Sequence, residues 1–308
     1  MLKDRPNLHH LTAGFIAVLV GYTSSAAIIF QAARAGSADA AVLASWMFAL
    51  GIGMGVASIG LSLAWRQPLF AAWSTPGAAL LVTGLPGVPL EQATGAFVCS
   101  SALIVLAAAT GLFRRLMQWI PASLGAAMLA GVLLPFGTDV FRALLADPVL
   151  VGLMMLSYLG LRRASSRFTM AGVLLVAVLW SAMTGTLDPH QLAWAVATPV
   201  FTRPVFDAAT LVSIGIPLFV VTMAAQNVPG IAVLRAHGYE PPVSQAIGWT
   251  GALGLLLAPF GAFALNLAAI SAAICMGPDV DPDPRRRYWA SVAGGVFYLL
   301  LGLFGAAI

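Results

Sequence analysis

The sequence predicts an all-α protein that crosses a membrane many times and contains two inverted repeats. Three observations predict this fold: an apolar composition, an uneven distribution of basic residues among the loops, and two pairs of matching segments far apart in the chain. Hydrophobic residues make up 60% of the chain and charged residues 8%, whereas a soluble domain contains about 25% charged residues. No soluble core could bury so much apolar surface, so the predicted solvent of these segments is a lipid bilayer.

Eleven apolar runs are long enough to cross the bilayer or to reach its midplane. They cover residues 11–33, 42–65, 69–84, 91–113, 121–136, 141–161, 168–186, 208–235, 243–258, 259–276 and 288–308. A full crossing takes about 20 residues, so the third and tenth runs are short. The third contains Pro76-Gly77, and the tenth contains Pro259 and Gly261. These residues interrupt helical hydrogen bonds, which is tolerated at membrane depth where the backbone packs on protein or lines a cavity.

The basic residues predict the orientation of the chain. If the N-terminus is cytoplasmic and the segments alternate, most of the 15 Lys and Arg residues fall on the cytoplasmic side. These are Lys3, Arg5, Arg66, Arg114, Arg115, Arg162, Arg163, Arg167, Arg235, Arg285, Arg286 and Arg287. The other three, Arg34, Arg142 and Arg203, fall on the opposite side. This is the distribution that the positive-inside rule requires, and it explains the basic pI without a nucleic-acid partner.

The first pair of matching segments consists of the two short runs. PLFAAWSTPGAAL (68–80) aligns with APFGAFALNLAAI (258–270), which places Phe263 opposite Trp73. Each copy has an extended first half, reaches a small or polar residue, and then becomes helical. We expect the two half-helices to begin near Thr75–Pro76 and Leu265–Asn266.

The second pair surrounds the first. Residues 23–46 and 225–249 each contain a polar cluster, a basic residue, a Gly, a short acidic loop and an Ala-rich run that ends in Trp. An odd number of crossings, seven, separates the two copies, so they face opposite sides of the membrane. Interrupted segments at matching positions of two inverted halves are typical of the binding sites of secondary transporters.

The polar residues inside the spans indicate what such a site would bind. No basic residue lies in the middle of a span, so an anion would be held by hydrogen bonds and by the positive ends of the half-helices. A carboxylate suits this arrangement. Gln226-Asn227 beside Pro229-Gly230 are two amides that need partners in a bilayer, and we expect them to contact the substrate. Single Ser and Thr residues are weaker indicators, because they often hydrogen bond their own helix.

The remaining ionisable residues favour no enzyme or metal site. Apart from Asp147, within the run at 141–161, the carboxylates fall in loops or at segment ends, and among these Glu91 and Asp139 are the closest to a span. We expect these two to be solvated, with proton coupling as the alternative. His9, His10 and His190 are expected as lone loop histidines, and the acidic loop at 279–283 lacks the Gly and Glu of a calcium site. Gly51–Gly55 predicts close helix packing.

Several stretches resemble the benzoate/proton symporter family, BenE. They are NLHHLTAGFIAVLVGYTSSAAIIFQAA, PLFAAWSTPGAALL, VVTMAAQNVPGIAVLRAHGY and the segment from APFGAFALNLAAI to the end of the chain. AWSTPGAAL and AAQN are the most specific of these motifs, and the similarity runs from about Asn7 to the last residue. The resemblance implies the fold of uracil permeases and sulfate transporters, with fourteen segments in two inverted repeats of seven. In that fold the third and tenth segments each begin as a short strand and continue as a half-helix.

The resemblance also implies a domain division. Residues 1–113 and 208–308 would form a core domain, and residues 114–207 would form the first part of a gate domain. Segments twelve to fourteen, the rest of the gate, are expected to be missing: either the chain is truncated or these segments were never part of it.

We therefore expect a secondary transporter of the bacterial inner membrane that takes up benzoate or a related aromatic carboxylate with a proton. The expected substrate-binding residues are Tyr22, Thr23, Ser24, Trp73, Ser74, Thr75, Pro76, Gly77, Gln226, Asn227, Phe263, Leu265 and Asn266, with Trp73 and Phe263 beside the ring. The proton would travel on the substrate or through Glu91 or Asp139. No cofactor or metal is expected, and a homodimer is an open alternative.

Two other functions are considered. A transporter of the same fold could carry a nucleobase or another small anion, but nucleobase carriers usually have acids in the eighth and tenth segments. Gln226, Asn227 and Asn266 stand there instead. An intramembrane enzyme would need a Ser/His or paired-Asp constellation within a span, and no predicted span contains a His or a pair of Asp residues.

Overall fold

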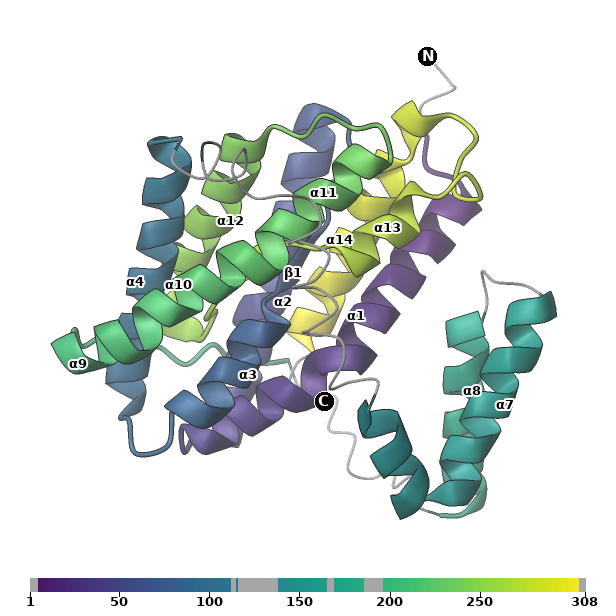
Figure 1. The fold of residues 1–308 in the computed structure, drawn as a ribbon, viewed down its shortest axis with the longest axis horizontal. Helices are drawn as coiled ribbons and strands as arrows, with labels where there is room; N and C mark the ends of the chain where they lie inside the picture. Colours follow the sequence, from purple (N-terminus) through teal and green to yellow (C-terminus); the bar gives the residue numbers. More distant parts are fainter. Residues whose placement is uncertain (1–4, 112–114, 116–137, 165–168, 186–195, 305–308) are drawn as a thin grey trace. The chain divides into compact units, whose positions relative to one another are not determined.

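The computed structural model describes residues 5–111, 115, 138–164, 169–185 and 196–304. The chain divides into two compact units, one of residues 1–128 with 194–308 and one of residues 129–193. Figure 1 shows the larger unit as a bundle of helices whose early and late segments lie side by side. The smaller unit contains α7 (Pro148–Ala164) and α8 (Thr169–Met183).

The larger unit is built from helices around one short sheet. In chain order its main elements are α1 (Leu8–Ala35), α2 (Ala40–Trp65), β1 (Ala71–Trp73), α3 (Thr75–Gly84), α4 (Leu90–Ala109), α9 (Ala208–Thr210), α10 (Ile216–Thr222), α11 (Val228–Ala236), α12 (Val243–Leu257), β2 (Leu265–Leu267), α13 (Ile270–Met276) and α14 (Tyr288–Leu303). Five helical stretches within the described residues are long and apolar enough to cross a membrane: Leu8–Ala35, Ala40–Trp65, Leu90–Ala109, Ala208–Ala236 and Val243–Phe260. The prediction of a mostly helical, multi-pass membrane protein is therefore confirmed.

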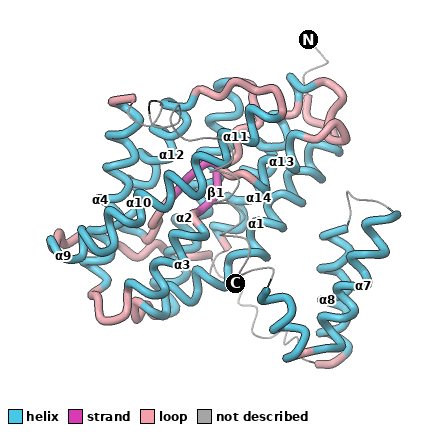
Figure 2. The backbone as a smooth tube through the Cα atoms, in the orientation of Figure 1, coloured by secondary structure: helices cyan, strands magenta, loops and turns pink. Residues whose placement is uncertain are grey.

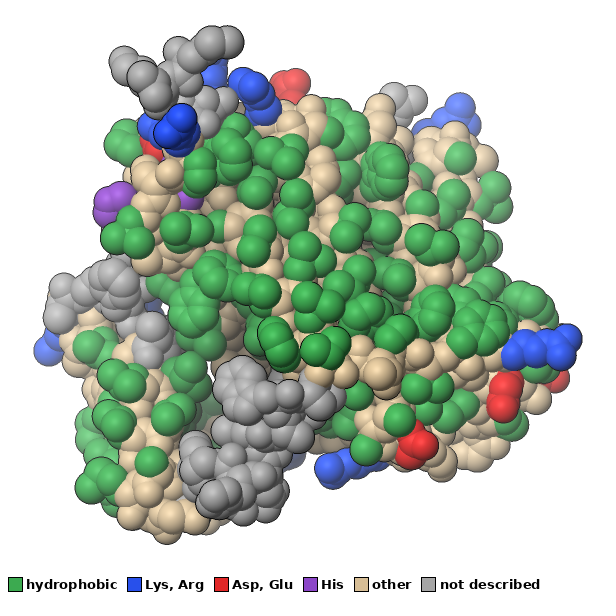
Figure 3. All heavy atoms as spheres, turned by 180° about the vertical axis from the view of Figure 1, so that it is seen from behind, with side chains coloured by type: hydrophobic (Ala, Val, Ile, Leu, Met, Phe, Trp, Pro, Cys, Tyr) green, Lys and Arg blue, Asp and Glu red, His purple; other side chains and the backbone are tan. Residues whose placement is uncertain are grey.

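The surface of the molecule fits a bilayer. In Figure 3, hydrophobic side chains cover the middle of the visible face, and charged side chains lie near its upper and lower edges. Large apolar residues such as Leu106, Val212 and Leu256 are more than half exposed. Exposed apolar surface of this extent is unfavourable in water and favourable against lipid.

One predicted run differs from the structure. The run at 141–161 is interrupted at Asp147, whose Oδ1 accepts a hydrogen bond from the Leu150 N–H (3.0 Å) and caps the start of α7. The Pro148 that follows has no N–H to continue the preceding helix. The helix at 208–236 is continuous, but it contains two π-helical turns, at Leu211–Gly215 and Met223–Asn227. The run at 121–136 lies outside the described residues.

A two-stranded antiparallel sheet lies in the middle of the larger unit (Figure 2). β1 pairs with β2 so that Ala71 lies opposite Leu267, Ala72 opposite Asn266, and Trp73 opposite Leu265. Beyond the strands, the Ser74 N–H donates to the Ala264 carbonyl (3.1 Å) and the Ala268 N–H to the Phe70 carbonyl (2.8 Å). The expected strand and half-helix in the third and tenth segments are thus both present.

The sequence alignment of these two segments was shifted. Trp73 is the last residue of β1, and Leu267 is the last residue of β2. The residue of the tenth segment that is equivalent to Trp73 is therefore Leu267 and not Phe263. The second half-helix begins at Ile270, whereas it was expected at Leu265–Asn266, which belong to strand β2. The alignment had matched Ala and Phe residues, which are so common in this chain that they fix the register poorly.

Glycine residues allow α14 to approach α1 and α2 closely. A Cβ atom added at Gly51 would lie 2.5 Å from the Gly302 Cα, and one at Gly14 would lie 2.5 Å from the Gly294 N. Gly55 is similarly close to the Gly295 carbonyl. In a bilayer, where hydrophobic burial does not drive helix association, such backbone contacts supply the packing energy. The predicted packing role of Gly51–Gly55 is confirmed.

A buried polar cluster joins the start of α1 to the segment between α13 and α14. His10 was expected in a loop, but it lies in the first turn of α1, where its Nδ1 accepts from the Asn7 N–H (3.0 Å). Its Nε2 lies 3.2 Å from Oδ2 of Asp281, and both side chains are at most 5% exposed. Arg287 donates to the carbonyls of Asp281 and Met276 (both 2.8 Å), which caps the end of α13. The sequence did not show this cluster, because His10 lies near the start of the chain and Asp281 near its end.

We predict that Gly51→Ala destabilises the protein, because the added methyl group would clash with the backbone of Gly302. Overpacking of this kind costs about 1–3 kcal/mol. Thermal unfolding of the purified protein in detergent should show a lower midpoint. Gly60→Ala is the control, since nothing lies within 4 Å of a Cβ placed there. Equal midpoints for the two variants would contradict the packing argument.

Candidate functional site

The N-terminus of α3 lies directly after β1. Ser74 is its N-cap, and the Ser74 Oγ accepts a hydrogen bond from the Gly77 N–H (3.1 Å). Pro76 occupies the first turn, where its missing N–H has no cost. The Thr75 N–H is then the free backbone donor of this turn among the described residues. The expected start of this half-helix at Thr75–Pro76 is confirmed.

The helix that contains α10 and α11 binds both strand–helix units. The Thr222 Oγ1, in α10, donates to the Ser74 Oγ at a distance of 3.1 Å. Five residues later, the Asn227 Oδ1 accepts from the Leu267 N–H of β2 (3.0 Å). Thr222, Ser74 and Asn227 are all fully buried. Thr222 was not among the expected site residues, because a single Thr in a helix gives no signal for a distant partner.

In the π-helical turn at Met223–Asn227, the side-chain amides of Gln226 and Asn227 have different surroundings. Asn227 points to β2 and also donates from its Nδ2 to the Met223 sulfur (3.3 Å), whereas Gln226 is only half-buried. Wide turns of this kind occur frequently at functional sites. In the next turn, a Cβ at Gly230 would lie 2.8 Å from the Leu267 carbonyl, so the helix lies directly against the strand. The requirement of Asn227 for a partner is met within the protein.

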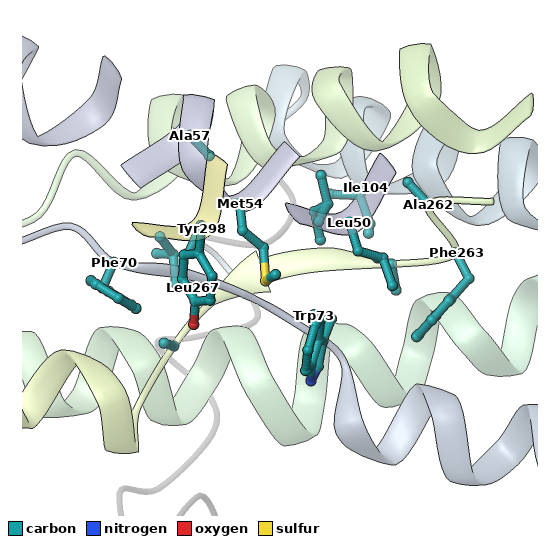
Figure 4. Close-up of a cluster of buried hydrophobic side chains, with 14 of the residues drawn as sticks. Leu50, Met54, Ala57, Phe70, Trp73, Ile104, Ala262, Phe263, Leu267 and Tyr298 are labelled. Carbon is teal, nitrogen blue, oxygen red and sulfur yellow. The ribbon is translucent and has the colours of Figure 1, made fainter. Parts of the chain in front are cut away.

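An aromatic pair lies beside Ser74. The Trp73 Nε1 donates to the Ser25 Oγ of α1 (2.7 Å), and the Tyr22 ring packs edge-on against Trp73 with centroids 4.6 Å apart. Tyr298 of α14 is close to Tyr22 as well, at 6.0 Å between centroids. Figure 4 shows Trp73 and Tyr298 in this part of the core. The hydroxyl of Tyr22 is buried and has no hydrogen-bond partner among the described residues.

Thr23 and Ser24, which were expected with Tyr22, lie on the exposed face of α1. The Thr23 hydroxyl donates to the Leu19 carbonyl (2.8 Å) and the Ser24 hydroxyl to the Gly21 carbonyl (3.2 Å). Ser25, in contrast, is buried against Trp73. The helical period places Tyr22 and Ser25, three residues apart, on the same face.

The remaining expected site residues lie on or next to β2. The Asn266 Nδ2 donates to the Leu267 carbonyl (3.0 Å), and its Oδ1 is buried without a partner among the described residues. Leu265 pairs with Trp73 across the sheet. Phe263 packs against the rings of Trp46 (6.0 Å) and Phe97 (6.1 Å), so it contributes to an aromatic cluster with α2 and α4.

The two carboxylates considered for proton coupling are both exposed. Glu91 is exposed in the first turn of α4. Asp139 is 56% exposed and forms an ion pair with Arg142 (2.9 Å) in the smaller unit. Asp207, at the start of α9, accepts hydrogen bonds from the backbone N–H and the hydroxyl of Thr210, and these hold its pKa below the usual range. Among the described residues, no three His, Cys, Asp or Glu side chains gather in a way that could hold a metal.

The sequence was compared with known proteins. A family model described as benzoate membrane transport protein, BenE, matches residues 5–308. The chain belongs to the BenE family. This is a family of membrane transporters and not of enzymes, which confirms the resemblance seen in the sequence.

Two curated relatives cover nearly the whole chain. The inner membrane protein YdcO of Escherichia coli is 47% identical over 298 residues, which are 97% of this chain and 76% of that protein. The benzoate membrane transport protein of Acinetobacter baylyi is 37% identical over 307 residues, which are 100% of this chain and 78% of that protein. This BenE chain thus corresponds to about three quarters of the length of each relative.

We predict that Asn227→Leu destabilises the BenE chain, because it leaves the Leu267 N–H buried without an acceptor. An unsatisfied buried donor costs about 1–3 kcal/mol. The midpoint of thermal unfolding in detergent measures this loss. Gln226→Leu is the matched control, since it changes the neighbouring, half-buried amide. If both variants unfold at the wild-type temperature, the Asn227 side chain does not hold β2.

Proposed function

We propose that this chain is a secondary transporter that takes up benzoate or a related aromatic carboxylate together with a proton. The observation that carries the proposal is the N-terminus of α3, where a free backbone N–H and two hydroxyls lie next to a buried aromatic pair. The Thr75 N–H and the hydroxyls of Ser74 and Thr75 are donors for a carboxylate, at the positive end of a helix. Tyr22 and Trp73 offer apolar ring surface beside them.

The unsatisfied groups around this point support a ligand site. The Tyr22 hydroxyl and the Asn266 Oδ1 are both buried without partners among the described residues. Buried polar groups are nearly always hydrogen-bonded, so each exception needs an explanation. A bound ligand or its accompanying water would supply the missing partners. The relative from Acinetobacter baylyi, named for benzoate transport, supports benzoate as the ligand.

The residues proposed to bind the substrate fall into five groups by position. Ser74, Thr75, Pro76 and Gly77 form the α3 terminus, and Tyr22 and Trp73 flank the ring. Asn227, Leu265 and Asn266 support the sheet beside the site, with Asn266 providing the free acceptor. Thr23, Ser24 and Gln226 lie on more exposed faces of their helices, where they would contact a substrate that approaches from outside the larger unit. Phe263 packs against Trp46 and Phe97, and its proposed contribution to the site is made through this aromatic cluster.

We also propose the arrangement of the chain in the membrane. The antiparallel pairing of β1 and β2, each followed by a half-helix, supports two inverted repeats of the seven-plus-seven type. Residues 1–113 and 208–308 would form the core domain, and residues 114–207 the first part of the gate. The compact unit of residues 129–193 falls inside that gate range. The basic residues support a cytoplasmic N-terminus, and the name of the Escherichia coli relative supports the inner membrane.

We predict that proteoliposomes containing this chain accumulate labelled benzoate when an inward proton gradient is imposed. Excess unlabelled benzoate should compete, whereas uracil and sulfate should not. Uptake that is indifferent to unlabelled benzoate would refute the proposed substrate. Uptake that is unchanged when the proton gradient collapses would refute the coupling.

A second prediction tests the position of the carboxylate. Thr75→Phe should reduce benzoate affinity at least about tenfold, because the bulky ring would cover donors whose hydrogen bonds to a charged group contribute about 1.5–3 kcal/mol. Thr83→Phe is the control, since Thr83 is exposed in the last turn of the same helix. Isothermal titration of the purified protein in detergent measures both affinities. Equal affinities for the two variants would exclude the α3 terminus as the carboxylate site.

The proposed route of the proton is the carboxyl group of the substrate itself, since Glu91 and Asp139 are both open to solvent. We predict that Glu91→Gln and Asp139→Asn retain the dependence of uptake on the proton gradient. Loss of this dependence in either variant would assign the proton to that side chain.

A further inference from the structure

An apolar hollow lies between α2 and α12, apart from the candidate site. Its volume is about 250 Å³, and it is lined by the last three turns of α2 together with Trp249 and Leu253 of α12. All of its lining residues are apolar or aromatic, and none is among the residues proposed to bind the substrate. Gly60, Ala64 and Trp249 are exposed, so the hollow is open to the surface that faces the bilayer.

Small residues of α2 leave this space empty. Gly60 and Ala64 are four residues apart and therefore lie on the same face of the helix. A Cβ added at Gly60 would meet nothing within 4 Å, whereas Gly51 and Gly55 of the same helix are in close contact with α14. A glycine inside a helix is unfavourable relative to alanine. Helix packing explains Gly51 and Gly55 but gives no reason for Gly60.

The length of the hollow matches one leaflet of a bilayer. It extends along α2 from Val56 to Trp65, nine residues that rise about 14 Å at 1.5 Å each. The hydrocarbon layer of one leaflet is about 15 Å thick, half of the bilayer core. Trp65 is the last residue of α2 and Arg66 is its C-cap, which the basic residues place on the cytoplasmic side. The hollow thus runs from the cytoplasmic interface to near the midplane.

We propose that the hollow binds one acyl chain of a phospholipid from the cytoplasmic leaflet. The proposal goes beyond transport and uses only the proposed orientation of the chain in the membrane. The hydrophobic effect does not favour the hollow over the surrounding lipid, because both are apolar. An acyl chain is held there because it restores the dispersion contacts that the atoms lining an empty hollow lack.

The cytoplasmic end of the hollow suits the rest of the lipid. Tryptophan side chains favour the level of the headgroups, and Trp65 lies at this end. The positive charge of Arg66, the next residue, attracts the phosphate of a headgroup. The Gln67 Nε2 donates to the Glu240 carbonyl (2.9 Å), which joins the loop after α2 to the loop before α12. The two walls of the hollow are therefore connected where the headgroup would lie.

The test is native mass spectrometry of the full chain, purified in a mild detergent and mixed with palmitoyl-oleoyl phosphatidylglycerol. Wild-type protein should retain one phospholipid after the detergent and the other lipids have been removed. Gly60→Leu places an apolar side chain in the hollow. We expect it to lower the retained fraction at least about fivefold, because the side chain and the acyl chain compete for the same space. Added phospholipid should also raise the midpoint of thermal unfolding of the wild type more than that of Gly60→Leu.

Ala252→Leu is the matched control. Ala252 is exposed on α12 outside the hollow, so the same side chain is added to the lipid-facing surface and phospholipid should be retained as in the wild type. If Gly60→Leu does not fold, Ala64→Leu fills the same hollow. The proposal is overturned if the wild type retains no phospholipid, or if the groove-filling variant retains as much as Ala252→Leu.

A second copy of the chain is the other occupant that the experiment detects. A wild-type dimer without phospholipid that Gly60→Leu converts to a monomer would assign the hollow to that copy and overturn the proposal. Benzoate takes no part in these measurements, so their outcome is independent of the proposed transport function.

Discussion

Inside a bilayer, every backbone N–H and carbonyl must find its partner within the protein. This constraint is most severe at β1 and β2, where two membrane segments stop being helical. The backbone groups that face the neighbouring strand hydrogen bond to it, and side chains accept from N–H groups that face away. The Ser58 Oγ accepts from the Ala71 N–H (2.9 Å), and the Asn227 Oδ1 accepts from the Leu267 N–H (3.0 Å). The rest of the larger unit is arranged to make these bonds available. Helix α2 supplies Ser58, and the helix with the π-helical turn supplies Asn227.

The same constraint explains why polar side chains gather at this point and which of them remain free for a ligand. Ser74 and Asn227 satisfy backbone groups, and Ser25 accepts from Trp73. Near the two strands, the Tyr22 hydroxyl and the Asn266 Oδ1 are buried without a partner among the described residues, and α3 leaves the Thr75 N–H unused. Two of these groups can donate and one only accepts, so the proposed ligand has both an anionic oxygen and a means to donate or to order water.

The helices and the start of α3 could be predicted from the sequence, because segment length, Pro76 and the N-cap Ser74 are local signals. Gly51 was also predictable, since the spacing of small residues indicates close packing. The contacts of Thr222, Asn227 and the pair of His10 with Asp281 were not, because each joins residues far apart in the chain. Which of the consecutive residues Tyr22–Ser25 would face Trp73 depended on the rotation of α1, and a helix that is apolar on most sides does not reveal its rotation. The predicted alignment of the tenth segment with the third was wrong for a related reason, because Ala-rich segments match each other at several offsets.

A site without a buried cation is consistent with transport. A lysine or arginine at mid-membrane depth would be costly to bury alone, and together with a carboxylate it would form a strong charge-assisted pair. Neutral donors such as the Ser74 hydroxyl and the Thr75 N–H give weaker bonds, and the apolar surface of Tyr22 and Trp73 adds about 25 cal/mol for each Å² of ring that it buries. A transported ligand has to leave the site as well as enter it. Affinity divided between ring burial and neutral donors meets both requirements, because departure of the ligand leaves no unpaired charge on the protein.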